Sequence, residues 1–370
     1  MVIEDGAFVG HKEICMKKIL VGGCGGAPTE GVINSLLFFD GRDEVIGMGS
    51  DPYDLILSSA KRKYVVPYAT EESYEKELIK ILNLEKPELI HCQNDLEMFE
   101  VSKIRDKIVT AGTKLFMPRH EVIDTCLNKY KTYRKWSEAG IKVPKNILIN
   151  DEKALKNAFQ QLANDKGEIW LRVSSIGAGG KGALPTNNFE FARGWIDWFD
   201  GWGDFVAAEM LTSKTVTWLS IWFEGKLVVA QTRLRKGWVH GNRTLSGVTG
   251  VTKVGMTYSD KMVDKLATDA ISAIDATPHG IYGVDMAYDS NGLPNPTEIN
   301  ISRFFTTILF FTTAGLNMPK IFKDIALYKE FPVLEKKINP LPDGLVWSRG
   351  MDTKPTLMPL NELNKNLITL

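Results

Sequence analysis

Three oxygen-bearing side chains lie close together in the sequence and could hold a divalent cation. Asp285 lies in the strand-like segment "GIYGVDMAYD", and Glu298 and Asn300 lie in "PTEINIS", beyond a turn rich in Gly, Pro and Asn. Side chains two residues apart on a strand share a face, and an antiparallel partner strand brings Asp285 to that face. Such ligands suit Mg²⁺ bound together with nucleotide phosphates. A polar hairpin exposed to water is the alternative that the residues leave open.

A glycine-rich stretch at 177–182 is the second chemical feature. Four of its six residues are glycine, and the missing Cβ lets backbone N–H groups approach an anion. Arg172 precedes the stretch on a strand-like run, two serines follow that run, and Lys181 lies within the stretch. The P-loop pattern does not fit, because Lys181 is followed by Gly182. The residues favour a flap that closes over phosphates from a β-hairpin, with a surface turn as the alternative.

An earlier glycine cluster, "VGGCGGAPTEG", follows the first strand-like run. It has Gly23 and Gly25 in the spacing of a dinucleotide fingerprint, but Pro28 stands where the third glycine belongs. Asp51 ends the next strand-like run and could hold a ribose, although an acid at that place is common. We interpret the cluster as a Rossmann-like turn used for packing or for a ligand other than a nicotinamide nucleotide.

The composition is that of an ordinary globular protein. Of 370 residues, 45 are Lys or Arg and 45 are Asp or Glu, so the formal net charge is zero. This balance gives no overall basic charge that would indicate binding to nucleic acid or anionic membranes, although it leaves a local basic patch open, and we expect small-molecule partners instead. The apolar segment 304–316 is too short to cross a bilayer and is predicted to form a buried helix. No signal peptide is recognisable, and four scattered cysteines indicate free thiols, so we expect a cytoplasmic protein.

The elements that must position these features follow two patterns. From Lys18 to Cys126 short apolar runs alternate with amphipathic segments, which predicts βαβ units and a doubly wound parallel sheet. From Asn128 a helix ends at Gly140, and strands and helices follow in mixed order. After Asp204 strand patterns dominate, interrupted by one amphipathic helix at "KMVDKLATDAISAI". The sequence therefore predicts an α/β domain followed by an α+β unit.

Taken in this order, the features resemble the ATP-grasp superfamily. The closest likeness is to single-module proteins related to the large subunit of carbamoyl-phosphate synthase and to carboxylate–amine ligases, and it covers residues 18–316. It implies an N-terminal Rossmann-like pre-ATP-grasp domain followed by a two-lobed ATP-grasp fold. The implied domains are 1–127 for the first domain, 128–205 for the small lobe with the flap, 206–330 for the large lobe with the MgATP site, and 331–370 for a C-terminal extension.

The resemblance also implies roles for individual residues. "CLNKYKTYRKW" would open the ATP-grasp unit, "AEML" would be the hinge that grips adenine, and "EINIS" resembles the E-x-N magnesium motif. Asp285, Glu298 and Asn300 would bind Mg²⁺, with Mn²⁺ as an alternative. The implied ATP-binding residues are Lys129, Arg172, Ser174, Ser175, Gly177, Gly179, Gly180, Glu209, Met210 and Leu211. The implied catalytic residues are Arg303, Lys181 and His240.

The chain departs from the family's pattern at two places. An acid that often follows the hinge and binds ribose is replaced by Thr215 and Thr217. The arginine that often follows E-x-N is displaced by one position, to Arg303. Basic residues in "QTRLRKGWVHGNR" are further candidates to bind a carboxylate.

The implied activity is that of an ATP-dependent ligase, which joins a carboxylate to an amine through an acylphosphate. Carboxyphosphate or carbamate chemistry, as in the synthase, is a second hypothesis, and a non-catalytic ATP-binding regulator is a third. The expected partners are a small-molecule carboxylate and an amine, and a homodimer stays open.

The flap hypothesis predicts that nucleotide protects the glycine-rich stretch from proteases. Ordering four glycines costs conformational entropy, so the loop should settle only when phosphates supply partners for its N–H groups. Limited proteolysis between Ser175 and Ala183 should therefore slow when MgATP is added. Equal cleavage rates with and without MgATP would support the surface turn instead.

Overall fold

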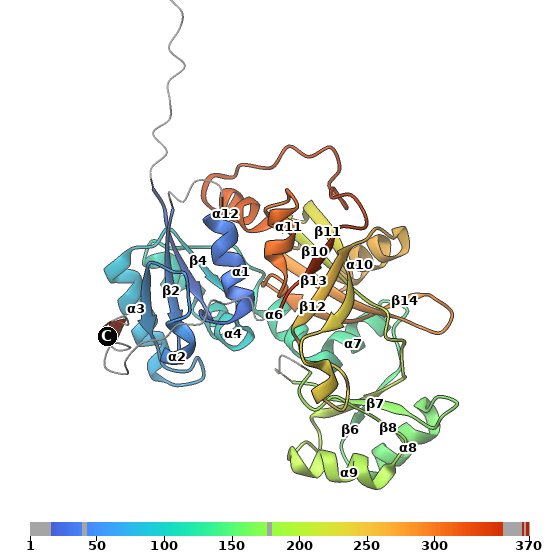
Figure 1. Cartoon of the computed structure of the whole chain (residues 1–370). Helices are drawn as coiled ribbons and strands as arrows, with labels where there is room; N and C mark the ends of the chain where they lie inside the picture. Colours follow the sequence, from blue (N-terminus) through green and yellow to red (C-terminus); the bar gives the residue numbers. More distant parts are fainter. Residues whose placement is uncertain (1–15, 39–42, 176–179, 351–364, 366–367, 370) are drawn as a thin grey trace, which may run out of the picture.

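The chain folds around three β-sheets, which follow one another along the sequence except that the C-terminal strand returns to the first sheet (Figure 1). The computed structural model describes residues 16–38, 43–175, 180–350, 365 and 368–369. The first sheet has six strands in the order β16-β3-β2-β1-β4-β5. The second has four strands in the order β6-β9-β7-β8, and the third has six in the order β14-β13-β10-β11-β12-β15.

The first sheet is parallel and carries helices, as the alternating pattern predicts. Its central strands are buried on both faces, which explains their unbroken apolar runs. The strands are β1 (Lys18–Gly22), β2 (Glu44–Gly49), β3 (Arg62–Val65), β4 (Leu89–Cys92), β5 (Lys114–Leu115) and β16 (Ile368–Thr369). The helices are α1 (Ala27–Leu36), α2 (Pro52–Leu55), α3 (Ser73–Glu85), α4 (Asp95–Lys103) and α5 (Arg105–Thr110).

The second sheet is antiparallel and small, and α8 and α9 cover it (Figure 1). Its strands are β6 (Asn146–Ile149), β7 (Ile169–Val173), β8 (Leu184–Thr186) and β9 (Phe205–Ala208), and its helices are α8 (Glu152–Leu162) and α9 (Phe189–Trp198). Strand β7 pairs antiparallel with β8, so the glycine-rich stretch connects the two strands of a hairpin, as predicted.

The third sheet is also antiparallel and contains the longest strands. They are β10 (Thr215–Phe223), β11 (Lys226–Trp238), β12 (Thr252–Thr257), β13 (Gly280–Tyr288), β14 (Pro294–Ile301) and β15 (Val346–Ser348). The remaining helices are α6 (His120–Leu127), α7 (Lys129–Glu138), the 3₁₀ helix Gly241–Arg243, α10 (Lys261–Ile274), α11 (Ile308–Thr313) and α12 (Met318–Tyr328). The C-terminal segment contributes β15 to this sheet and β16 to the first sheet.

Helix α7 links the second and third sheets. Its Trp136 is buried, and the indole N–H donates to the Ala270 carbonyl of α10 at 2.9 Å. At its N-terminus, Asn128 caps the helix by accepting from the Lys131 N–H, and the Lys129 N–H donates to the Ser174 carbonyl just after β7. Helix α7 therefore fixes the start of the glycine-rich connection relative to the third sheet.

Two expectations about apolar segments can now be compared with the structure. The segment 304–316 is buried, but only Ile308–Thr313 is helical, so the helix is shorter than predicted. Cys24, Cys92 and Cys126 are buried free thiols, as expected, and Cys15 lies outside the described residues. Among the described helices, none combines the length and apolarity that crossing a membrane requires.

The first glycine cluster forms a tight turn between β1 and α1. Gly25 has φ of +102°, and a Cβ placed on it would lie 2.1 Å from the backbone oxygen of Asp54. Asp51, considered above as a ribose ligand, instead caps α2 by accepting from the N–H groups of Tyr53 and Asp54. Both observations support packing at Gly25 and Asp51, whereas Gly23, Gly26 and Pro28 line a polar cavity, so the alternative of a different ligand stays open for this cluster.

Replacing Gly25 with alanine should therefore destabilise the protein strongly. The Cβ would enforce a strained φ and clash with backbone that cannot move cheaply, so we expect a loss of about 2–4 kcal/mol. The neighbouring Gly26 is the matched control, because its φ is −81° and the nearest atom to a Cβ, in Pro28, is 3.6 Å away. Urea unfolding of both variants measures the difference, and equal losses would contradict the account of the turn.

Candidate active site between the sheets

Two adjoining cavities lie where the three sheets approach one another. The polar cavity, of about 390 Å³, is lined by residues of all three, including Gln93, Asp95, Lys129, Arg233, Glu298 and Arg303. The hinge cavity, of about 550 Å³, is lined by Pro144, Pro185, residues 208–213, Met286 and Ala287. The wall that both cavities share includes Trp170, Arg172, Arg235, Asp285 and Glu298.

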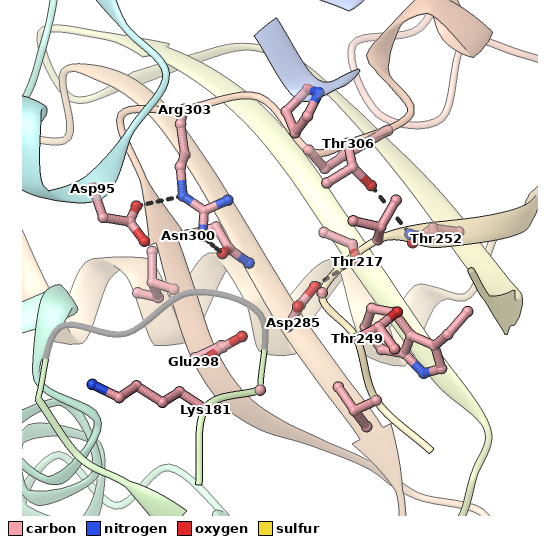
Figure 2. A pocket seen from close by; sticks show the side chains of 18 of the residues that line it. Asp95, Lys181, Thr217, Thr249, Thr252, Asp285, Glu298, Asn300, Arg303 and Thr306 are labelled. Carbon is pink, nitrogen blue, oxygen red and sulfur yellow. Dashed lines mark hydrogen bonds and ion pairs between the residues drawn. The ribbon is translucent and has the colours of Figure 1, made fainter. Parts of the chain in front are cut away.

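The three predicted metal ligands come together on β13 and β14. Asp285 lies directly opposite Glu298 in the antiparallel register, and Asn300 lies opposite Gly283. Figure 2 shows the three side chains grouped beside the cavity. The Asp285 carboxylate accepts from the Thr217 hydroxyl at 2.5 Å, and Glu298 lies 3.8 Å from the Lys129 ammonium.

This donor set fits a hard cation. Two carboxylates and one amide oxygen are ligands that Mg²⁺ accepts when substrate phosphates and water complete its coordination. Among the described residues, no group of three or more His, Cys, Asp or Glu side chains is arranged to hold a metal by itself. A cation at Asp285, Glu298 and Asn300 would therefore need further oxygens from a ligand.

Lys129 and Arg172 place positive charge at the polar cavity, and Arg172 also belongs to the shared wall. Burial lowers the pKa of Lys129, and the negative charge of Glu298 opposes this effect. Burial likewise lowers the pKa of Arg172. The Arg172 guanidinium donates to the Thr297 carbonyl at 3.0 Å, and its buried Nε has no hydrogen-bond partner among the described residues. A buried cation with an unused donor is a physical argument for an anionic ligand.

Arg303 is held by a residue of the first sheet. Its Nε donates to Asp95 at 2.5 Å, and its Nη2 donates to the Asn300 side chain (Figure 2). Burial alone would lower the pKa of Arg303, but Asp95 and Glu298 outweigh burial and raise the pKa. Gln93, two residues before Asp95, receives the Phe304 N–H at 3.1 Å and donates to the Phe304 carbonyl. The loop after β4 therefore orients the segment that carries Arg303.

Asp95 and Gln93 belong to the site although no sequence motif identified them. Both follow β4, and the carboxyl ends of parallel strands are where such sheets bind ligands. The segment "CQND" could have indicated both residues, because it places three polar side chains directly after a buried strand.

Ser174 and Ser175 do not lie free to bind phosphate. The Ser174 hydroxyl is buried, donates to Asn128 and accepts from the Tyr130 N–H. The Ser175 hydroxyl and N–H both donate to the Asp204 carboxylate, at 2.6 and 2.9 Å. The two serines therefore anchor the end of β7, in contrast to the expected role as phosphate donors.

The remaining predicted flap residues divide into two groups. Gly180 and the exposed Lys181 line the polar cavity, as Glu298 does (Figure 2). Gly180 has φ of +75°, a conformation that favours glycine. Gly177 and Gly179 lie outside the described residues.

The predicted hinge residues line the other cavity. Glu209, Met210 and Leu211 follow β9 and contribute to the hinge cavity. Glu209 is fixed to the Lys145 backbone, since its N–H donates to the Lys145 carbonyl at 3.2 Å and its carboxylate accepts from the Lys145 N–H at 3.0 Å.

His240 and the two threonines differ from the expectations. His240 is exposed, has a left-handed backbone with φ of 54°, and lines neither cavity. Thr217 is buried and bridges charged groups, because it donates to Asp285 and accepts from Arg233. Thr215 accepts from Arg235 at 2.9 Å. The threonine hydroxyls are thus already used by protein partners.

The Arg303–Asp95 pair should contribute more to stability than an exposed ion pair does. Replacing Asp95 with alanine leaves a mostly buried guanidinium without its carboxylate, so we expect a loss of about 1–3 kcal/mol. Asp124→Ala is the control, because the Asp124 and Lys131 side chains are 42% and 54% exposed and such pairs contribute about 0–1 kcal/mol. Urea unfolding measures both, and a loss for Asp95→Ala no larger than for Asp124→Ala would contradict this assignment.

Comparison with known proteins gives a match at the level of structure. No family model matches the chain, and no curated protein sequence matches it. The carboxyaminoimidazole ribonucleotide synthase of Aspergillus clavatus, solved with ATP, is 15% identical with a TM-score of 0.65, over 87% of this chain and 79% of that one. The L-amino acid ligase of Bacillus licheniformis is 13% identical with a TM-score of 0.60, over 84% and 74%.

A third similar structure is the biotin carboxylase domain of the Hydrogenobacter thermophilus 2-oxoglutarate carboxylase. It was solved with MgADP, ADP and bicarbonate, is 14% identical and has a TM-score of 0.67, over 90% of this chain and 73% of that one. At these identities the likeness establishes the fold, and the predicted resemblance is confirmed at that level. The chain therefore has the ATP-grasp fold, in which a parallel-sheet N-terminal domain precedes two antiparallel sheets.

Proposed function

We propose that the chain is an ATP-dependent ligase that joins a carboxylate to an amine through an acylphosphate. The observation that carries this proposal is the shared wall between the two cavities. It combines the buried cation Arg172 with the carboxylates of Asp285 and Glu298, and the buried cation Lys129 lies beside it in the polar cavity, 3.8 Å from Glu298. Cations and cation ligands side by side, next to an apolar cavity, suit a nucleotide triphosphate bound with a divalent metal.

In this proposal the nucleotide spans the two cavities. The base lies in the hinge cavity against Met210, Leu211 and Met286, and the phosphates lie along Lys129 and Arg172. Several similar structures were solved with ATP or MgADP, which supports a nucleotide in this fold. Lys181, at the end of the hairpin connection, is the further cation available to the phosphates.

Asp285, Glu298 and Asn300 would hold Mg²⁺. The metal would neutralise charge on the phosphates during in-line transfer. Thr217 supports this role, because its hydroxyl donates to one oxygen of Asp285 and orients the carboxylate, whose other oxygen lies 3.5 Å from the Arg235 guanidinium.

The polar cavity beyond the phosphates would hold the reacting substrates. A carboxylate oxygen forms a bond to the γ-phosphorus as the bond to the β-phosphate oxygen breaks, and ADP leaves. The amine nitrogen then attacks the acyl carbon, phosphate leaves, and the amine loses a proton. Arg303, fixed by Asp95 and Asn300, is positioned to stabilise negative charge on the acylphosphate.

A substrate screen tests the proposed activity. ADP release would be measured with MgATP and panels of carboxylates and amines, in pairs and singly. Release that requires both a carboxylate and an amine supports the ligase. Release with bicarbonate as the carboxylate points to carboxyphosphate chemistry, and MgATP binding without release on any pair points to a regulator.

Glu298→Gln should abolish turnover and leave the fold intact. The substitution removes a charge from the metal-binding face without removing packing, so we expect kcat to fall by at least about 100-fold. Glu190→Gln, an exposed change on α9, is the matched control and should keep wild-type turnover. Near-normal turnover by Glu298→Gln at limiting Mg²⁺ would mean that the β13–β14 hairpin is only a polar turn.

A further inference from the structure

One side of the polar cavity contains a buried arginine that forms no direct ion pair within the described part of the chain. Arg233 lies on β11, is 1% exposed and lines the polar cavity. Its two terminal nitrogens donate to the hydroxyls of Thr307 and Thr217, each at 2.8 Å. Among the described residues, no carboxylate forms an ion pair with it, and its buried Nε has no hydrogen-bond partner.

The surroundings make this buried charge more costly. Burial first, and then the neighbouring charge of Arg235, lower the pKa of Arg233 well below its usual value. The Arg233 guanidinium also lies 4.4 Å from the centre of the Phe305 ring, which desolvates one of its faces. The charge of Asp285 opposes this shift only in part, so a buried guanidinium without a direct ion pair, beside a second guanidinium, costs free energy unless an anion binds there.

Arg235 and two threonines extend the same surface. Arg235 stacks on Trp238 at 4.0 Å, donates to Thr252, and lies 3.5 Å from Asp285. The Thr306 hydroxyl oxygen accepts from the Thr252 N–H at 3.3 Å, and its proton can be donated into the cavity (Figure 2). Arg233, Arg235, Thr252 and Thr306 therefore gather donors on one side of the polar cavity, which we call the arginine floor.

We propose that the arginine floor binds an oxyanion of the substrate, either a carboxylate or a phosphate ester, so that the ligase acts on an anionic small molecule. That the bound anion belongs to a substrate rests on the proposed function, whereas the existence of an anion site at Arg233 does not. Arginine guanidinium groups with converging hydroxyls suit planar or tetrahedral oxyanions. The nucleotide phosphates have their own cations, Arg172 at the shared wall and Lys129 beside it, so Arg233, which lines the polar cavity and not the hinge cavity, is left for a second anion.

Calorimetry with malonate and with inorganic phosphate tests the site directly. Each probe is titrated into the full chain in saturating MgADP, which occupies the nucleotide site, and again without nucleotide. We expect one of the two probes to bind both with and without MgADP. Binding of malonate would identify a carboxylate site, and binding of phosphate would identify a phosphate-ester site. If MgADP does not bind, the proposed function fails, whereas the titration without nucleotide still tests the arginine floor.

Two variants locate the binding. Arg233→Met should lower the affinity for the bound probe by at least about 30-fold while the affinity for MgADP stays within about twofold. Its midpoint of thermal unfolding should equal or exceed that of the wild type, because the variant loses a buried, unneutralised charge. Thr306→Val, which keeps the arginines and the side-chain shape, should lower probe affinity about threefold to tenfold.

Two results would overturn the proposal. One is that neither malonate nor phosphate binds to the wild type. The other is that a probe binds with equal affinity to Arg233→Met, or to Thr306→Val if the first variant does not fold. Arg172→Met separates the sites, since it should weaken MgADP and leave probe binding in the absence of nucleotide unchanged.

Discussion

The antiparallel register of β13 and β14 is the constraint on which the site depends. It sets Asp285 opposite Glu298 and keeps Asn300 on the same side of the hairpin. Because side chains alternate along a strand, a shift of one residue would turn Glu298 and Asn300 away from the cavity. The register is in turn held by β10, which pairs with β13 along its whole length and brings Thr217 opposite Asp285.

The charges of the site are arranged around this hairpin in an order that favours a bound nucleotide. Lys129 approaches Glu298 from α7, and Arg303 is held over Asn300 by Asp95 from the first sheet. Lys129 and Arg303 are thus partly neutralised, yet the buried Nε groups of Arg172 and Arg233 have no hydrogen-bond partner in the part of the chain that the structure describes. Burying these groups costs free energy, and an anion bound at the site would offset that cost. Ligand binding should therefore stabilise the folded protein.

Local patterns predicted much of this structure, because they depend on neighbours in the sequence. Apolar alternation identified the parallel sheet, and a spacing of two residues put Glu298 and Asn300 on one face. Contacts between distant segments could not be predicted from local patterns. Asp95 forms an ion pair with Arg303 across 208 positions, and the Asp204 carboxylate accepts from both the N–H and the hydroxyl of Ser175. The burial of Arg233 depends on Thr217, Thr307 and Phe305 together, and no local pattern reports such a combination.

The central claim is that the shared wall between the two cavities binds MgATP, and nucleotide titration tests it most directly. Wild-type protein would be titrated calorimetrically with ATP and, separately, with NADH, each in excess Mg²⁺. The account predicts saturable ATP binding that weakens by at least about tenfold in Arg172→Met, and no measurable NADH binding. Tight NADH binding without ATP binding would contradict it, because the ligand would then belong to the glycine turn of the first sheet.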